Sequence, residues 1–306
     1  MKKIYNNFKN EIAAVNKELL QDIPHDVTLL QNVFNHIFNA GGKRLRPLLT
    51  LAFSRDSCSN NSCSEAAICL AAAVELIHTA TLLHDDVIDN ATIRRNIITA
   101  NSIWDNKTSI LVGDNMFSKA FQLIVKSGKL PAFKELANAS ATISAAEVWQ
   151  IQILNRINTT INEYIHLVTD KTAVLFAAAC AVGAICVDSD VDRAREFGLN
   201  FGILYQIKDD LLDYFGDEDV LGKETFQDIR EGKVTLPLIM LLSAVSNDEL
   251  SLVSPMIGSY QIDKALLCDL MKKYCVEKKV HEFSKIYREN LSKIVPCNIR
   301  EILNEI

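Results

Sequence analysis

The stretch ELIHTATLLHDDVID at residues 75–89 joins a long apolar run to a dense group of carboxylates. In and just before this stretch, apolar residues recur at spacings of three and four, which is the period of an α-helix. These residues are Ala66, Cys69, Leu70, Ala73, Val74 and Ile77. Because residues 65–89 are apolar on nearly every side, we expect a central helix enclosed by other helices or by a partner subunit.

The same helical spacing continues outward over most of the 306 residues, and no strand-like alternation of comparable length occurs. Only 11 Gly and 6 Pro interrupt the chain, and 49% of it is hydrophobic, which favours a helical fold with a substantial core. Residues 171–187 form a second segment that is apolar nearly all round. With no evident linker or repeat, we expect an all-α fold in one domain, residues 1–306.

Two copies of the pattern DDxxD stand at the ends of apolar helical segments. Their aspartates are Asp85, Asp86 and Asp89 in the first copy, and Asp209, Asp210 and Asp213 in the second. The first and last aspartates of each copy are four apart and share a helix face, where like charges repel unless a cation lies between them. Carboxylates suit Mg²⁺, which commonly bridges them to phosphates, so the pattern predicts a magnesium site for a phosphate or diphosphate.

A single DDxxD could equally be a solvated helix end or a group of capping acids. Two copies in the same position relative to an apolar helix favour the metal interpretation. His84, beside Asp85, is more simply a structural residue, or a hydrogen-bonding neighbour of a carboxylate that binds metal.

Basic residues accompany both acidic clusters. GGKRLRP at residues 41–47 places Lys43 and Arg46 three apart, on one face of an expected helix, and its glycines allow close approach of a ligand. Arg94 and Arg95 follow the first cluster, and Lys223 and Lys233 follow the second in a Gly-containing loop. Each alone is most simply a surface charge. Together they fit the recognition of two diphosphates, one through metals and one through Arg and Lys directly.

The net charge of −6 disfavours nucleic acid as a partner. The eight cysteines show no CxxC pairing, so we expect reduced thiols in a cytoplasmic protein. The first 15 residues lack the apolar core of a secretory signal, and the longest apolar run, 173–187, is shorter than a membrane span. We therefore expect no transmembrane segment.

These motifs resemble those of the trans-polyprenyl diphosphate synthases, most closely the octaprenyl-type enzymes of quinone side-chain synthesis. The resemblance runs from about Gly41 to Pro237 and is highly specific in order and spacing. Its motifs are GGKRLRP (41–47), ELIHTATLLHDDVID (75–89), Arg94-Arg95, LVGD (111–114), DKTA (170–173), YQIKDDLLD (205–213) and EGKVTLP (231–237). It implies an isoprenoid-synthase-type helical bundle around a deep central cavity, and a homodimer.

The resemblance also implies a role for each matching residue. The six aspartates of the two DDxxD motifs would hold two or three Mg²⁺ ions that clamp the allylic diphosphate. The cationic partners of that diphosphate would be Arg94, Lys171, Lys223 and Lys233. The isopentenyl diphosphate site would comprise Lys43, Arg46, His78 and Arg95. Thr172 and Gln206 resemble residues near the reacting allylic carbon.

Three positions depart from the family pattern. Asn96 stands where a glycine usually follows the arginine pair, Ala145-Ala146-Glu147 replaces Glu-Gly-Glu, and Phe226 replaces a glycine in the loop after Lys223. None of them removes a charged group from the metal or diphosphate residues, so we expect effects on loop closure and turnover rather than on reaction type.

The expected reaction ionises an allylic diphosphate, which isopentenyl diphosphate then attacks, while a dry apolar cavity protects the cation. Ala80 and Thr81 precede Asp85 by about one helical turn and would border the growing chain. Short-chain relatives carry a bulky aromatic residue there, so we expect a long product. Deeper residues would form the floor: Ile77, Val74, Leu123, Ile124 and Leu136. Ile77 and Val74 are equally expected to be core residues.

Other readings remain open. A shorter-chain synthase, of the geranylgeranyl or farnesyl type, is one alternative, and the non-catalytic subunit of a heteromeric synthase is another, although such a subunit is expected to have lost one aspartate cluster. A terpene cyclase shares the ionisation chemistry but generally carries a different second metal motif and lacks GGKRLRP. A metal phosphohydrolase is suggested only by the pair His84-Asp85, and no second pair at ligand spacing occurs.

Overall fold

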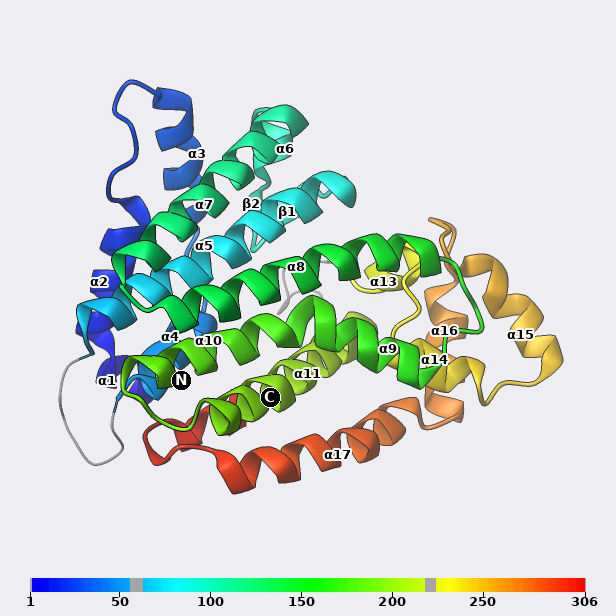
Figure 1. The fold of residues 1–306 in the computed structure, drawn as a ribbon. Helices are drawn as coiled ribbons and strands as arrows, with labels where there is room; N and C mark the ends of the chain where they lie inside the picture. Colours follow the sequence, from blue (N-terminus) through cyan, green and yellow to red (C-terminus); the bar gives the residue numbers. More distant parts are fainter. Residues whose placement is uncertain (1, 56–62, 218–223, 306) are drawn as a thin grey trace. The chain divides into compact units, whose positions relative to one another are not determined.

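The computed structural model describes residues 2–55, 63–217 and 224–305 (Figure 1). The chain forms two compact units, each assembled from segments that are separate in sequence. Unit 1 comprises Met1–Ser140, Leu175–Gly198 and Val295–Glu305, and unit 2 comprises Ala141–Val174 and Leu199–Ile294. The expected all-α architecture is confirmed, apart from one small hairpin.

Unit 1 contains the N-terminal helices. They are α1 (Lys2–Asn7), α2 (Lys9–Leu20), α3 (Thr28–Asn39), α4 (Leu45–Phe53), α5 (Glu65–Ile88), α6 (Ala100–Ile103), α7 (Asn106–Lys126) and the first part of α8 (Leu130–Ile153). It also contains the strands β1 (Ile93–Arg94) and β2 (Ile97–Ile98), nearly all of α10 (Val174–Cys186), the start of α11 (Val191–Phe215) and the 3₁₀-helix η3 (Cys297–Glu305).

Unit 2 contains the ends of α8 and α11 together with a series of mostly short helices. They are α9 (Ile161–Val168), the π-helical turn η1 (Thr169–Ala173), α13 (Gln227–Arg230), α14 (Leu236–Leu242), α15 (Asn247–Val253), the 3₁₀-helix η2 (Ser254–Met256), α16 (Lys264–Lys273) and α17 (Val276–Ile294). Apolar side chains of α9, α11, α14, α16 and α17 form its core.

Helix α5 is enclosed along most of its length in unit 1. Ser64 caps its N-terminus by accepting a hydrogen bond from the backbone N–H of Ala67 at 3.2 Å. Nearly every side chain from Ala67 to Ala80 is buried, and α5 packs along α7. The prediction of an enclosed helix over residues 65–89 is therefore confirmed.

Helix α10 is the second core helix, and every residue from Leu175 to Ile185 is buried. It lies close to α4. A Cβ atom on Gly183 would stand only 2.3 Å from the carbonyl oxygen of Thr50. The hydroxyl of Thr50 also donates to the carbonyl of Ala179 at 2.9 Å. A glycine at position 183 is therefore required for this contact.

Strands β1 and β2 form a hairpin that was not predicted, in which Ile93 pairs with Ile98 and Arg94 with Ile97. Its two-residue turn, Arg95 and Asn96, has positive φ at both positions, 53° and 63°. Hairpin turns of this kind favour Asn or Gly, and Asn tolerates the left-handed region better than other residues with a side chain. The departure from glycine at Asn96 is thus compatible with the turn.

Two helical segments, Glu65–Ile88 and Ile161–Cys186, are long and apolar enough to cross a membrane by length and composition alone. The most apolar windows of these segments are 72% and 67% buried inside the structure. Such burial is typical of core helices, which meet the same criteria.

Candidate functional site

The first aspartate cluster lies at the C-terminal end of α5. Asp89 is the C-cap residue, and its backbone N–H donates to the carbonyl of Asp85 at 2.8 Å. Asp85 and Asp89 are partly exposed, whereas Asp86 is buried. A helix C-terminus carries partial negative charge, so carboxylates there are unfavourable unless a cation or donor group compensates them.

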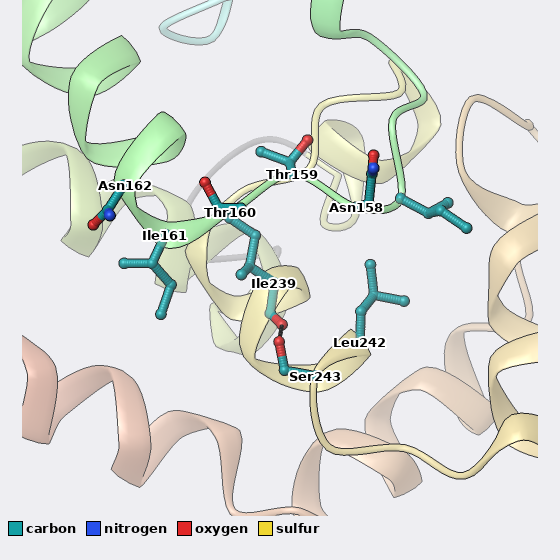
Figure 2. A pocket seen from close by; sticks show the side chains of 9 residues that line it. Asn158, Thr159, Thr160, Ile161, Asn162, Ile239, Leu242 and Ser243 are labelled. Atoms are coloured by element: carbon teal, nitrogen blue, oxygen red, sulfur yellow. Dashed lines mark hydrogen bonds between the residues drawn. The ribbon is translucent and has the colours of Figure 1, made fainter.

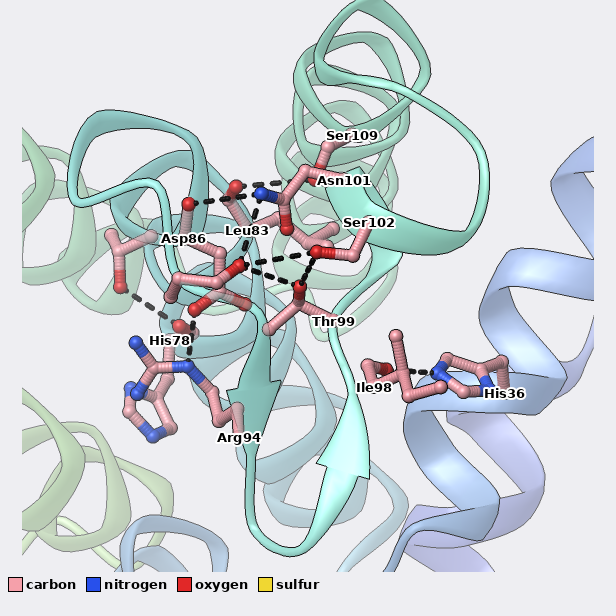
Figure 3. Close-up of polar contacts among 12 residues, drawn as sticks. His36, His78, Leu83, Asp86, Arg94, Ile98, Thr99, Asn101, Ser102 and Ser109 are labelled. Atoms are coloured by element: carbon pink, nitrogen blue, oxygen red, sulfur yellow. Dashed lines mark hydrogen bonds and ion pairs between the residues drawn. The ribbon is translucent and has the colours of Figure 1, made fainter. Parts of the chain in front are cut away.

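The hairpin supplies such a donor to Asp86. The Nε of Arg94 donates to Oδ1 of Asp86 at 2.6 Å (Figure 3). Burial raises the pKa of Asp86, and the Arg94 guanidinium opposes this shift. Asn101 fixes the turn after α5 by donating to the carbonyls of Asp86 and Ala91 at 3.2 and 3.1 Å. Arg94 is therefore held beside the first cluster.

His78 lies about two helical turns before the cluster, within range of the charges of four arginines. Burial lowers the pKa of His78 well below its ordinary value, and the positive charges of these arginines lower it further. They are Arg46, Arg95, Arg94 and Arg44. A neutral histidine among guanidinium groups is well suited to contact an anion without adding to the repulsion among the cations. Three of the residues predicted to bind isopentenyl diphosphate, Arg46, His78 and Arg95, are brought together here.

The segment 41–46 is held by Arg95 of the hairpin turn and by Arg44. Nη1 of Arg95 donates to the carbonyl of Gly41 at 3.2 Å, and a Cβ on Gly42 would stand 2.6 Å from that nitrogen. Arg44, which sequence reasoning left without a role, forms a buried ion pair with Glu75 at 2.6 Å. Gly42 thus makes room for the Arg95 side chain, whereas a Cβ on Gly41 would meet nothing within 4 Å.

One expectation for this segment is wrong. Helix α4 begins at Leu45, and Arg44 has a left-handed backbone with φ 41°, so Lys43 precedes the helix and cannot share a helix face with Arg46. Arg46 instead lies over the ring of Phe176, with its guanidinium carbon 4.0 Å from the ring centroid. This cation–π contact fixes the direction of the Arg46 side chain.

The LVGD motif has a packing role next to the first cluster. A Cβ atom on Gly113 would stand 2.4 Å from Nε2 of His84, so only glycine lets α7 lie against this ring. Nε2 of His84 lies 3.2 Å from the carbonyl oxygen of Ile110 and 3.6 Å from Asp114. The structural role expected for His84 agrees with these contacts.

The second aspartate cluster lies near the C-terminal end of α11, in unit 2. Asp210 is buried and accepts two short hydrogen bonds, one from the hydroxyl of Tyr164 at 2.6 Å and one from Nε2 of Gln206 at 2.7 Å. Burial raises the pKa of Asp210 to about 7, and repulsion from Asp209 and Asp213 adds to this effect, while the two hydrogen bonds oppose it. Tyr164 was missed by sequence reasoning, since it lies 46 residues before its partner.

Asp209 and Asp213 do not share one environment, although they are four residues apart on α11. Asp209 is exposed, whereas Asp213 is 2% exposed and accepts the backbone N–H groups of Gln227 and Asp228 at 3.1 Å each. Asp228 is a further acid near the cluster. Burial raises its pKa well above the ordinary value, and repulsion from Asp213 and Asp210 adds to this effect. Asp213 thus caps α13, a role that helix periodicity could not predict.

Lys171 and Thr172 lie in the π-helical turn η1. Nζ of Lys171 contacts Glu147 at 2.8 Å and Gln150 at 3.1 Å, so the glutamate retained in the segment 145–147 pairs with this lysine. The hydroxyl of Thr172 donates to Gln206 at 2.9 Å. Single π-helical turns inside α-helices occur frequently at functional sites. Here the turn joins Thr172 through Gln206 to Asp210.

The remaining predicted residues differ in how far the structure describes them. Lys223 lies outside the described residues. Lys233 forms an ion pair with Glu231 at 2.6 Å in the turn after α13. The proposed chain-length residues of α5 are all in unit 1: Val74, Ile77 and Ala80 are fully buried, and Thr81 is partly buried. Leu123 and Ile124 of α7 and Leu136 of α8 are buried in the same unit.

The donor atoms of the clusters suit magnesium. Among the described residues 2–55, 63–217 and 224–305, no three His, Cys, Asp or Glu side chains lie close enough together to form a metal site. Mg²⁺, however, usually takes only one or two protein carboxylates and completes its shell with water and phosphate oxygens. Asp85 and Asp89 in unit 1, and Asp209 in unit 2, are the accessible carboxylates of their clusters, and each cluster by itself offers donors of the kind that such an ion takes.

A separate cavity of about 410 Å³ lies in unit 2, where the loop before α9 meets α14 (Figure 2). Its lining residues are Ile157, Asn158, Thr159, Thr160, Ile161, Asn162, Ile239, Leu242 and Ser243. Of the predicted site residues that the structure describes, none lines it. The lining carries no formal charge, so the cavity is poorly suited to a diphosphate.

Comparison with known proteins agrees with these motifs. The model of the polyprenyl synthetase family matches residues 27–273. The chain is 36% identical over 261 residues to an all-trans-nonaprenyl-diphosphate synthase (geranyl-diphosphate specific) of Rhodobacter capsulatus, covering 84% of this chain and 80% of the relative. It is 34% identical over 304 residues to a geranylgeranyl diphosphate synthase of Sulfolobus acidocaldarius, covering 95% and 91%.

Among solved structures, a polyprenyl synthase from Caulobacter crescentus CB15, complexed with calcium and isoprenyl diphosphate, matches with a TM-score of 0.87. Its sequence is 34% identical, and the match covers 99% of this chain and 95% of that one.

Proposed function

The chain belongs to the polyprenyl synthetase family and is a trans-prenyl diphosphate synthase, and from this premise we propose that it makes a long-chain all-trans product. It would extend an allylic diphosphate, with farnesyl diphosphate as the expected primer, by repeated addition of isopentenyl diphosphate. The observation that supports this proposal most directly is in unit 1. There the carboxylates at the end of α5 lie near the arginines whose charges act on His78, and Arg94 contacts Asp86. Such a combination suits two diphosphates, one bound through metal and one directly.

The proposed roles follow the exposure of each side chain. Asp85, Asp89 and Asp209 would hold Mg²⁺, which supplies positive charge for the departing diphosphate. The calcium in the Caulobacter crescentus structure supports a divalent cation in this fold. Asp86, Asp210 and Asp213 would orient the neighbouring groups, because each is buried and already accepts hydrogen bonds.

The cationic side chains would divide between the two substrates. Lys43, Arg46, Arg95 and neutral His78 would bind isopentenyl diphosphate, and Arg94, Lys171, Lys223 and Lys233 would bind the allylic diphosphate. Thr172 and Gln206, which are hydrogen-bonded to each other, would lie near the reacting carbon. The buried apolar face of α5 would exclude water from the allylic cation.

Product length is the finer part of the proposal. Ala80 and Thr81 are small, so a long tail could pass them, and we propose an octaprenyl-type product for quinone synthesis. The relatives include both a nonaprenyl and a geranylgeranyl synthase at nearly equal identity, so a shorter product is the alternative. A non-catalytic subunit is a second alternative, but both aspartate clusters are intact in this chain.

We also propose a cytoplasmic homodimer. Large apolar side chains are exposed on α7 and at the start of α8, which a second copy of the chain could cover. They include Leu111, Phe121, Val125, Leu130 and Phe133, with exposures of 57%, 40%, 73%, 79% and 39%. Release of a long polyprenyl product would then involve transient contact with a membrane.

The decisive assay incubates the purified protein with labelled isopentenyl diphosphate, farnesyl diphosphate and Mg²⁺, and sizes the products by chromatography. We expect products near eight isoprene units, and no turnover when EDTA removes the metal. Products that stop at geranylgeranyl length would support the shorter-chain alternative. A folded protein without any elongation would contradict the enzymatic proposal and support a non-catalytic subunit.

A prediction concerns Tyr164, which acts on the cluster through Asp210. Tyr164→Phe removes one of the two side-chain donors to a buried carboxylate, so the Mg²⁺ concentration for half-maximal activity should rise on the order of 10-fold. Turnover at saturating Mg²⁺ should change much less. Tyr287→Phe, in the partly buried face of α17, is the matched control and should leave the Mg²⁺ dependence unchanged. Identical Mg²⁺ curves for both variants would exclude this role for Tyr164.

A further inference from the structure

Phe226 stands in a backbone conformation that disfavours its side chain. Its φ is 62°, in the left-handed region, and it is the N-cap residue of α13. Glycine adopts this region without steric cost, whereas a residue with a bulky side chain is strained there. Something in the surrounding structure must therefore compensate phenylalanine.

The compensation comes from burial of the ring. Phe226 is 3% exposed and belongs to the apolar core of unit 2. Its ring meets that of Tyr214 edge-on, with centroids 5.4 Å apart and planes at 83°, and Nζ of Lys264 lies 5.8 Å from its centroid. The next apolar residue of α13, Ile229, is fully buried in the same core. The start of α13 is thus anchored by side-chain packing rather than left as a glycine turn.

The anchored turn presents three successive amides to Asp213. The N–H of Phe226 donates to the backbone carbonyl of Asp213 at 2.7 Å. The N–H groups of Gln227 and Asp228 donate to the two carboxylate oxygens, Oδ1 and Oδ2, at 3.1 Å each. The buried ring, together with Ile229, therefore fixes the direction of these amides.

The same turn carries charged groups toward the second cluster. The backbone N–H of Lys233 donates to the carbonyl of Asp228 at 2.8 Å, and the N–H of Gly232 donates to the carbonyl of Ile229 at 3.1 Å. Both bonds tie Lys233 to α13 within one short segment. A change in the seating of α13 is therefore expected to shift Lys233 together with Asp228.

We infer that Phe226 is a positioning residue for the half of the site that binds the allylic diphosphate. It acts through the cap on Asp213 and through the α13 turn on Lys233, and this inference rests on the proposed function. The ring itself is buried and contacts no substrate. Its replacement should therefore weaken binding of the allylic diphosphate and leave binding of isopentenyl diphosphate nearly unchanged.

The test compares Phe226→Gly, which removes both ring and backbone strain, with Phe34→Leu, a fully buried aromatic residue of α3 in unit 1. For Phe226→Gly we expect the KM for farnesyl diphosphate to rise on the order of 10-fold. The KM for isopentenyl diphosphate should change by less than about twofold, because the lost ground-state binding is that of the allylic substrate alone. Hydrogen exchange measured without substrate should show faster exchange at the amides of Phe226, Gln227 and Asp228.

Phe34→Leu should lower thermal stability without changing either KM or the hydrogen-exchange rates of these amides. Equal KM changes for both substrates, or a folded Phe226→Gly protein with the wild-type KM for farnesyl diphosphate, would overturn the inference. If Phe226→Gly does not fold, Phe226→Leu keeps an apolar side chain and should show the same selective change at smaller size. An inactive wild type would refute the proposed function. The exchange measurement needs no turnover, so the role of Phe226 in holding the start of α13 could still be tested.

Discussion

Asp85→Ala is expected to lower turnover by about 10²- to 10³-fold, the range found when one group that stabilises developing negative charge is removed. Asp85 is partly exposed at the C-terminal end of α5, so its truncation leaves no large cavity in the core. The helical circular dichroism should therefore match that of the wild type. Activity should be measured at saturating Mg²⁺, with Asp269→Ala, an exposed aspartate of α16, as the control.

The same substitution should have the opposite effect on stability in the absence of ligands. A carboxylate near a helix C-terminus opposes the helix dipole and costs about 0.3–1 kcal/mol. Without metal, Asp85→Ala should thus unfold at the same or a slightly higher temperature than the wild type. Adding Mg²⁺ and inorganic diphosphate should raise the melting temperature of the wild type only. Substantial residual activity, or equal stabilisation of both proteins by these ligands, would contradict the metal role of Asp85.

The sequence was most informative about the helical core. The period of three and four residues in 65–89 correctly predicts α5, because burial on all sides leaves an unbroken apolar pattern. The second core segment, 171–187, is also helical, but its first residues form the π-helical turn η1 that carries Lys171 and Thr172. A π-turn has no distinct sequence period, so it could not be predicted.

The hairpin could not be predicted for a similar reason. Each strand has two residues, which is too short for any alternation to be visible, and its turn uses Arg95 and Asn96 instead of a glycine. Its functional consequence, the contact of Arg94 with Asp86, depends on this turn. The motif identified the arginine pair, but only the structure separates Arg94 at Asp86 from Arg95 at Gly41.

The roles of individual aspartates also lay beyond the sequence pattern. The spacing treats Asp209 and Asp213 as equivalent, yet one is exposed and the other accepts two backbone amides from residues 14 and 15 positions away. Asp210 accepts a hydrogen bond from Tyr164, which is 46 residues away in sequence. A helix pattern records which residues share a face but not which partners fold onto that face.

Ala80→Tyr is expected to shorten the product to about the farnesyl or geranylgeranyl class. Ala80 lies in α5 just over one turn before Asp85, and a phenol ring there would obstruct the path proposed for the growing tail. Product lengths should be compared by thin-layer chromatography at equal substrate consumption. Ala80→Ser, which adds a single oxygen, is the conservative control and should keep the long product.

The stability of Ala80→Tyr shows whether Ala80 borders a path for the growing tail or lies in a filled core. Ala80 and Ala72 are both fully buried in α5. A tyrosine at either position therefore needs room for a ring beyond the volume of the alanine side chain. Overpacking of a filled core typically costs about 1–3 kcal/mol, so Ala72→Tyr should lower the melting temperature without altering product length. If Ala80 borders a cavity that the tail enters, Ala80→Tyr should lose less stability than Ala72→Tyr and still shorten the product. A folded Ala80→Tyr enzyme with the wild-type product would place the tail elsewhere and make Ala80 an ordinary core residue.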